Sequence, residues 1–228
     1  MSASAVALAS PNTASNMACG TRPYSYAGIA GWRATSGVAA TLVAQVQPQV
    51  EHGHVAAWVG VGGVGLGPGG SDEWLQAGYA ADGSTSDLYY EVAKPNAAPQ
   101  YHSIGRKAAP GEAHRVAVIE MQNRPGWWRI WVDRVPVSQP IFLADSHGRW
   151  APIVTSESWN GGMSSCNAFA YSFSTIRVRQ ASWRLLADAY PIRSPGYAVA
   201  WRPGAMVAQS GTREPLAVTD GAARSSRS

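Results

Sequence analysis

The chain has 228 residues, a mass of 24.1 kDa and a formal net charge of +4. Its lysines and arginines are scattered without a basic run, which argues against a nucleic acid partner, and no segment of about 18 apolar residues suggests a membrane span. Only 14% of the residues are charged, whereas glycine, proline and tryptophan occur 24, 15 and 10 times. This composition is typical of a turn-rich all-β protein with few or no helices.

The first segment, residues 1–30, is expected to be an N-terminal arm. It contains a short apolar stretch, Ala-Val-Ala-Leu-Ala, followed by small residues that resemble a signal cleavage site, but it lacks a positively charged start. We therefore interpret it as the remnant of a signal peptide and expect a secreted, extracellular protein, although this chain carries no complete signal peptide.

Residues 31–208 are expected to form a single domain, followed by a disordered tail at 209–228. Alternating apolar and polar residues, bounded by turn residues, predict eight strands, of which the seventh ends at Trp159. After residue 180 the pattern weakens, and residues 196–209 predict one or two edge strands. Many strands without intervening helices indicate a sandwich or a barrel. The eight predicted strands are 39–47, 54–61, 73–80, 87–93, 114–122, 127–133, 151–159 and 168–180.

Three motifs that could carry chemistry are set aside. Gly-Val-Gly-Gly-Val-Gly at 60–65 has the spacing of a dinucleotide-binding loop, but the following Leu-Gly-Pro-Gly-Gly cannot begin a helix, so a flexible loop is predicted. His52 and His54 are expected on one strand face, yet no third ligand lies nearby in the sequence, so no metal is expected. Asp-Ser-His at 145–147 is not a catalytic triad, because triad members meet through folding rather than adjacency. No cofactor is predicted.

The two cysteines, Cys19 and Cys166, are far apart in the sequence and have no metal-binding spacing. One possibility is a disulfide that joins the N-terminal arm to the loop after residue 160, which would stabilise the fold by about 4 kcal/mol. The other is a pair of free, buried thiols.

Polar side chains inside aromatic strands are the remaining candidates for a functional site. Trp74 and Gln76 share one strand face, Glu157 and Trp159 share another, and Glu91 follows two tyrosines. A buried carboxylate needs partners because its desolvation is costly. Each of these side chains is thus either a satisfied polar group of the core or part of a site.

The order of these segments resembles the glutamic peptidases, also called eqolisins. The matching segments are Trp-Val-Gly at 58–60, Leu-Gln-Ala-Gly at 75–78, Tyr-Tyr-Glu at 89–91 and a late strand with Glu157 near a tryptophan, within residues 40 to 180. The resemblance implies an antiparallel, concanavalin-like β-sandwich (jelly roll) of two sheets, with a cleft on a concave face. It also implies a catalytic pair, Gln76 and Glu157. The supporting residues of the cleft would be Trp58, Trp74, Glu91 and Trp159.

In the mechanism that the resemblance implies, the glutamate is the general base for an attacking water and then the general acid for the leaving amine, while the glutamine amide stabilises the oxyanion. The chain departs from the family pattern in two places. Gly62 stands where the family carries an acidic residue. Ser158 separates Glu157 from its tryptophan, whereas the family's glutamate directly precedes the tryptophan, which changes the strand face of Trp159.

The sequence therefore supports a secreted, acid-acting glutamic-type endopeptidase, expected to be a monomer that acts on peptide or protein substrates. The alternative is a non-catalytic secreted β-sandwich that binds peptide or carbohydrate in an aromatic-lined cleft. A third hypothesis is a glycosidase that uses the carboxylates of Glu91 and Glu157.

Overall fold

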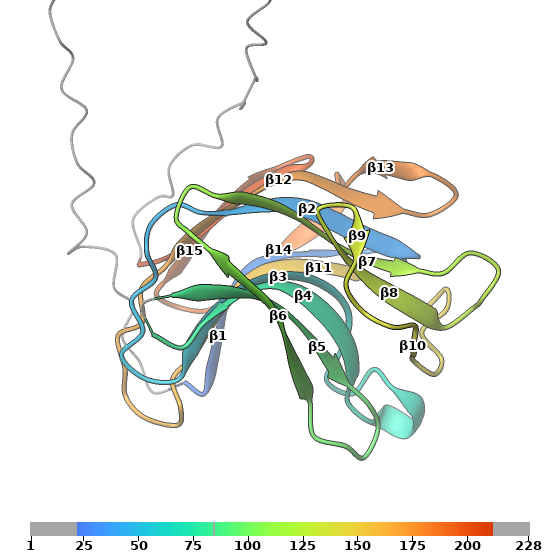
Figure 1. Ribbon diagram of the computed structural model, residues 1–228, viewed down its shortest axis with the longest axis horizontal. Helices are drawn as coiled ribbons and strands as arrows, with labels where there is room; N and C mark the ends of the chain where they lie inside the picture. Colours follow the sequence, from blue (N-terminus) through green and yellow to red (C-terminus); the bar gives the residue numbers. More distant parts are fainter. Residues whose placement is uncertain (1–21, 84, 212–228) are drawn as a thin grey trace, which may run out of the picture.

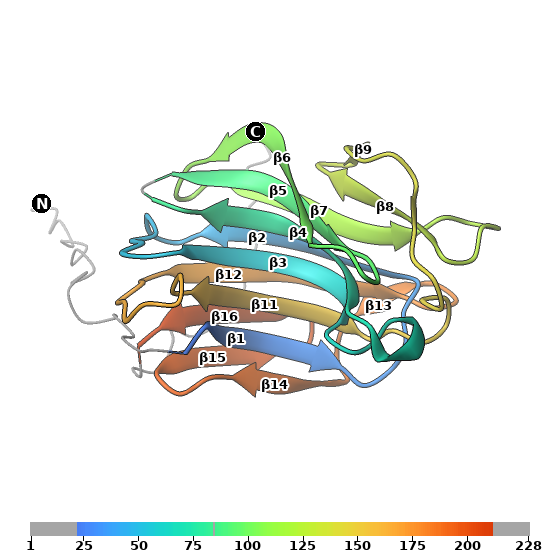
Figure 2. The same cartoon turned by 90° about the horizontal axis from the view of Figure 1, so that it is seen from below.

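The computed structural model describes residues 22–83 and 85–211, which form two antiparallel sheets packed in two layers (Figure 1). The first sheet has seven strands in the order β14-β1-β11-β3-β4-β5-β6 and is seen from its outer side in Figure 2. Its strands, in that order, are Ala189–Arg193, Tyr24–Gly31, Pro152–Trp159, His54–Gly63, Glu73–Ala81, Ser86–Ala93 and Gln100–Ala108.

The second sheet has nine strands, and β10-β8-β7-β2-β12-β16-β15 is its main path. The helical part of the described residues is one short 3₁₀ turn, Pro68–Gly70. None of the described residues belongs to a helix long and apolar enough to cross a membrane. The main path consists of Ile141–Phe142, Trp127–Val132, Ala113–Glu120, Gly37–Ala44, Ala170–Arg179, Ala205–Ser210 and Tyr197–Arg202, with β13 (Trp183–Leu185) paired to β12 and β9 (Val135–Pro136) paired to β8.

The hydrophobic core lies between the two sheets and follows the alternation of strand residues. In β3 the odd-numbered residues from Val55 to Val61 are buried in this core, whereas Ala56 and Trp58 belong to a separate small cluster with Tyr89. Successive side chains of a strand point to opposite faces, so the even-numbered residues of β3 lie on the outer face of the first sheet. The predicted two-sheet antiparallel sandwich is confirmed.

All eight predicted strands are present, as β2, β3, β4, β5, β7, β8, β11 and β12. β1 was not predicted: it lies in the segment expected to be an arm, yet it pairs with β11 and β14 inside the first sheet. Its Gly28 packs so closely on β11 that a Cβ would overlap the Thr155 side chain. Apart from two tyrosines and one isoleucine, β1 consists of glycine, alanine and serine, so it lacks the regular alternation of apolar and polar residues that predicts a strand.

Two further expectations change. Residues 60–63 continue β3 instead of forming a flexible loop. Of the predicted C-terminal edge strands, β15 lies at the sheet edge, but β16 lies between β15 and β12 and ends at Ser210, two residues beyond the expected domain limit. Most of the predicted signal remnant and of the tail lies outside the described residues, and the division into arm, domain and tail stays a prediction.

Tyr79 of β4 joins the two sheets through its hydroxyl group. The ring is fully buried, and the hydroxyl lies 2.9 Å from the carbonyl oxygen of Leu42 in β2 and 3.2 Å from that of Glu112. Burial of the phenol raises its pKa, so the hydroxyl keeps its proton and remains a donor. The strand that carries Gln76 is thereby tied to the second sheet.

We expect Tyr79→Phe to lower the free energy of unfolding by about 1 kcal/mol, because the ring remains while a buried hydrogen bond is lost. Urea denaturation at neutral pH measures this change. Tyr190→Phe is the matched control, since that ring is 36% exposed. An equal effect of the two substitutions would contradict the bridging role of Tyr79.

Candidate functional site

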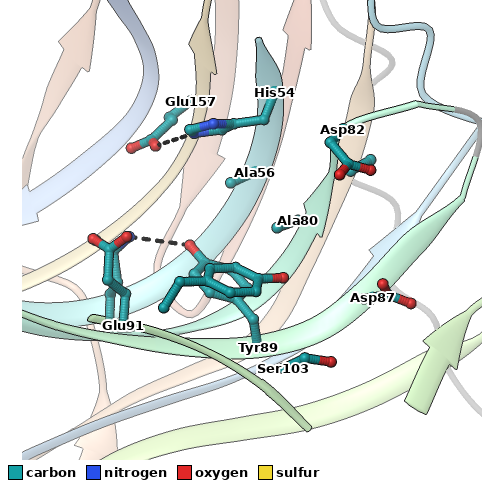
Figure 3. Close-up of a pocket in the computed structure, with 12 residues that line it drawn as sticks. His54, Ala56, Ala80, Asp82, Asp87, Tyr89, Glu91, Ser103 and Glu157 are labelled. Atoms are coloured by element: carbon teal, nitrogen blue, oxygen red, sulfur yellow. Dashed lines mark hydrogen bonds and ion pairs between the residues drawn. The ribbon is translucent and has the colours of Figure 1, made fainter. Parts of the chain in front are cut away.

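A groove of about 320 Å³ lies on the outer face of the first sheet (Figure 3). Ala56 of β3 and Ala80 of β4 are opposite each other in the register and line it with methyl groups only. These two alanines form the floor of the groove, and larger polar side chains from β11, β4 and β5 surround it. The shape follows from the sequence, because bulky residues at these two positions would fill the space between the polar groups.

Glu157 enters the groove from β11 and is only 7% exposed. In the register it lies opposite Ala56, so His54 and Trp58, two residues to either side on the same face, are its diagonal neighbours. The Nε1 of Trp58 donates to Oε2 at 3.1 Å, and Nε2 of His54 lies 3.1 Å from Oε1. Both carboxylate oxygens are therefore held by donors from one strand.

Gln76 enters the same groove from β4 and is also 7% exposed. It lies between Gly60 of β3 and Glu91 of β5 in the register. A Cβ on Gly60 would lie 2.8 Å from the carbonyl oxygen of Leu75 and 3.0 Å from the Gln76 Cβ, so the glycine lets β3 approach β4 closely beside Gln76. The amide Nε2 donates to the hydroxyl oxygen of Tyr89 at 3.1 Å, which uses one of its two N–H groups.

Glu91 is the second glutamate of the groove and comes from β5. Its Oε1 accepts a hydrogen bond from the indole Nε1 of Trp74 at 2.9 Å. Burial raises the pKa of the Glu91 carboxyl, and the negative charge of Glu157 acts in the same direction, while the Trp74 hydrogen bond opposes them. Glu91 thus holds its proton to a higher pH than an exposed glutamate.

Aromatic rings border the two carboxylates. The ring of Trp159 lies 5.3 Å from the His54 ring and 6.3 Å from that of Tyr24, and the ring of Tyr101 is stacked on Tyr89 at 5.1 Å. Burial raises the pKa of Tyr101 to about 12, with the nearby carboxylates adding to the effect. These phenols are neutral in acid and at neutral pH and can serve as hydrogen-bond donors.

The groove is acidic although the whole chain is basic. Asp82, which follows β4, and Asp87 of β5 line its other end, so four carboxyl groups face this space (Figure 3). Among the described residues that line the groove there is no lysine or arginine, and His54 is the one that can carry a positive charge. A bound cationic or neutral ligand would therefore be favoured over an anion.

The structure brings together the residues singled out in the sequence. Gln76, Glu157 and Glu91 line one groove, while Trp58 and Trp74 donate to the two glutamates. The ring of Trp159 lies beside that of His54, with the two ring planes tilted by 43°. Their catalytic and supporting roles stay predictions, as does the disulfide, because Cys19 lies outside the described residues.

The sequence did not predict the role of His54, which was paired with His52 as a weak metal motif. Gly53 between them has a φ of +73°, and β3 begins only at His54, so the expected common strand face is wrong. The described residues contain no group of three or more histidine, cysteine, aspartate and glutamate side chains that could hold a metal ion. The sequence did contain one indication that His54 belongs to the site: it precedes Trp58 by four residues in the same strand, so the two side chains share a strand face.

The raised pKa of Glu91 has a consequence for stability. The folded protein binds this proton more tightly than the unfolded chain, so Glu91 favours folding below its ordinary pKa of 4.5, and this contribution is lost as the pH rises through the raised value. We expect the free energy of unfolding of Glu91→Gln, measured by urea denaturation, to fall less than that of the wild type from pH 4 to pH 7.

Glu112→Gln is the control, because the pKa of Glu112 is shifted in the opposite direction to that of Glu91. The backbone N–H of Ala109 lowers the pKa of Glu112, so this carboxylate favours folding above its ordinary pKa of 4.5 and loses its contribution as the pH falls. Identical pH dependence in the wild type and Glu91→Gln would contradict the burial effect at Glu91.

Comparison with known proteins places this groove in a known fold. No protein-family model and no curated protein matches the chain. Two solved structures of scytalido-glutamic peptidase with transition-state analogues match with TM-scores of 0.56, at 17% and 19% identity, over 83% and 84% of this chain and 98% and 99% of theirs. SCP-B, an eqolisin peptidase bound to the tripeptide Ala-Ile-His, matches with a TM-score of 0.53 at 17% identity, over 82% of this chain and 98% of that one. The chain therefore has the β-sandwich fold of the glutamic peptidases.

Proposed function

We propose that the protein is a secreted glutamic-type endopeptidase that hydrolyses peptide bonds in acid, with Glu157 and Gln76 as its catalytic pair. The observation that carries the proposal is that these two side chains, from strands separated by β3, line the same open groove. The shared fold with peptide-cleaving enzymes supports it. No metal or cofactor is needed for this chemistry.

Glu157 is the general base in this proposal. Its carboxylate takes a proton from a water molecule as the water oxygen attacks the peptide carbonyl carbon, and a tetrahedral oxyanion forms. The protonated Glu157 then gives that proton to the leaving nitrogen as the C–N bond breaks. Each carboxylate oxygen has two lone pairs, so the bonds from His54 and Trp58 leave acceptor capacity for the water.

Gln76 stabilises the oxyanion. The hydrogen bond to Tyr89 fixes the amide plane and uses one N–H, so the second N–H is available for the developing negative charge. A neutral amide can do this without adding a charge beside the base. Because the amide is more than nine-tenths buried, little rotation is open to it, and its donor is oriented before the substrate binds.

The binding-module hypothesis has one observation in its favour. Tyr24 and Tyr101 near the groove are 48% and 51% exposed, and exposed aromatic rings are suited to hold a peptide backbone or a sugar ring without any reaction. This arrangement serves an enzyme equally well. A direct assay of cleavage separates the two functions.

We expect the wild type to cleave an unfolded protein substrate between pH 2 and 7, with activity confined to the acid part of this range. Glu157→Gln should lower the cleavage rate about 10²- to 10⁴-fold through loss of the base, and Gln76→Ala about 10²- to 10³-fold through loss of one oxyanion donor. Release of peptide fragments, followed by mass spectrometry, measures both rates.

Glu112→Gln, an isosteric change outside the groove, should keep the wild-type rate. If the folded wild type does not cleave any substrate, even after any processing step is supplied, the peptidase proposal is wrong. Peptide or oligosaccharide binding without turnover would then establish the binding module, and hydrolysis of an oligosaccharide would instead favour the Glu91 and Glu157 carboxylate pair.

A further inference from the structure

His54 is the group in the groove that neither the fold nor the proposed catalytic pair accounts for. It begins β3, is about one-third exposed, and its Nε2 lies 3.1 Å from Oε1 of Glu157. A carboxylate only accepts hydrogen bonds, so Nε2 carries the proton in this contact. The second nitrogen of the ring, Nδ1, can take up a further proton and turn the hydrogen bond into an ion pair.

The two donors to Glu157 differ in how they respond to pH. The indole N–H of Trp58 is neutral and remains a donor at every pH of interest. An imidazole, in contrast, can take up a second proton, and with it the ring supplies a positive charge as well as a donor to the carboxylate. An opposite charge within hydrogen-bond distance favours the ionised carboxylate over the acid form.

The described residues around His54 and Glu157 do not supply any other positive charge to the carboxylate. The other titratable groups near the pair are neutral or negative: burial raises the pKa values of the Tyr26 and Tyr89 phenols, so they stay neutral, and burial also raises the pKa of the Glu91 carboxyl, which never carries a positive charge. No other described lining residue supplies a cation. The titratable groups that face the pair are Tyr24 and Tyr26 from β1, Asp82 after β4, Asp87, Tyr89 and Glu91 from β5, and Tyr101 from β6.

Trp159 adds an orientation constraint. Its ring packs against the imidazole at 5.3 Å and is itself stacked on Tyr24, so the imidazole lies between this tryptophan and the carboxylate. Because one residue, Ser158, separates Glu157 from Trp159 in β11, the tryptophan side chain shares the groove face with the glutamate. The unexpected spacing near Glu157 and the unassigned histidine are therefore parts of one arrangement.

We propose that His54 is a positioning residue whose imidazolium keeps the Glu157 carboxylate ionised and oriented in acid, and that it thereby extends the proposed peptidase activity to lower pH. This inference rests on the proposed function for its catalytic part. Its electrostatic part, the coupling between the two side chains, holds without any activity.

The first experiment follows the cleavage rate against pH. In His54→Gln the amide nitrogen replaces Nε2 as a donor but carries no charge, so we expect the rate at the optimum to stay within about threefold of the wild type while kcat/KM on the acid side falls about tenfold. In His54→Ala both the charge and the donor are lost, and kcat should fall at the optimum as well. His102→Gln, on a histidine stacked against Tyr90, is the matched control and should keep the wild-type profile.

The second experiment needs no activity. The imidazole of His54 is titrated by NMR in the wild type and in Glu157→Gln, with the signal assigned from its loss in His54→Gln. We expect a lower titration midpoint in Glu157→Gln, because the anionic partner of the imidazolium is gone. An unchanged midpoint overturns the proposal, whatever the enzyme assay gives.

The two experiments together separate the possible failures. A shifted NMR midpoint with no cleavage by the wild type would show that the pair is coupled but that the proposed function is wrong. Cleavage by the wild type, with a superimposable pH profile in His54→Gln, would keep the peptidase function and overturn the role of His54.

Discussion

The register between β11 and β3 is the constraint on which the groove depends. With Glu157 opposite Ala56, the His54 and Trp58 side chains straddle its carboxylate, and the continuation of the same register through β4 and β5 brings Gln76 and Glu91 to the same face. A slip of one residue would turn Glu157 toward the apolar core between the sheets. Since desolvating an unpartnered carboxylate is costly, the core itself selects against that slip and so protects the arrangement of the site.

The two glutamates of the groove have different hydrogen-bond partners. Glu91 has a neutral donor, the Trp74 indole, and its burial favours the protonated form. Glu157 has both a neutral indole and an imidazole. Two carboxyl groups of the same type, on the same face of one sheet, are thereby placed in different environments. In enzymes, a difference in environment of this kind is what separates the pKa values of two carboxyl groups.

Strand alternation alone was enough to predict most of the sandwich and the common face of Trp74 and Gln76, because apolar residues with a period of two are a local property of the sequence. It could not predict β1, whose glycines and alanines fit a crowded position beside Thr155, or β6, an edge strand with mostly exposed side chains. Pairing of His54 with Glu157 joins residues 103 positions apart, and no local pattern encodes that register. The resemblance of short motifs selected the glutamates, but it offered nothing on the histidine that contacts Glu157.

Tyr79 gives the groove a mechanical property. The residue is only three positions from Gln76, on the opposite face of the same strand, and its hydroxyl is bonded to the second sheet. The part of β4 that carries Gln76 and Ala80 is therefore coupled to the contact between the layers, and a displacement of this strand would strain the Tyr79 hydrogen bond. A ligand that fits the groove in its present shape would leave this contact between the layers intact.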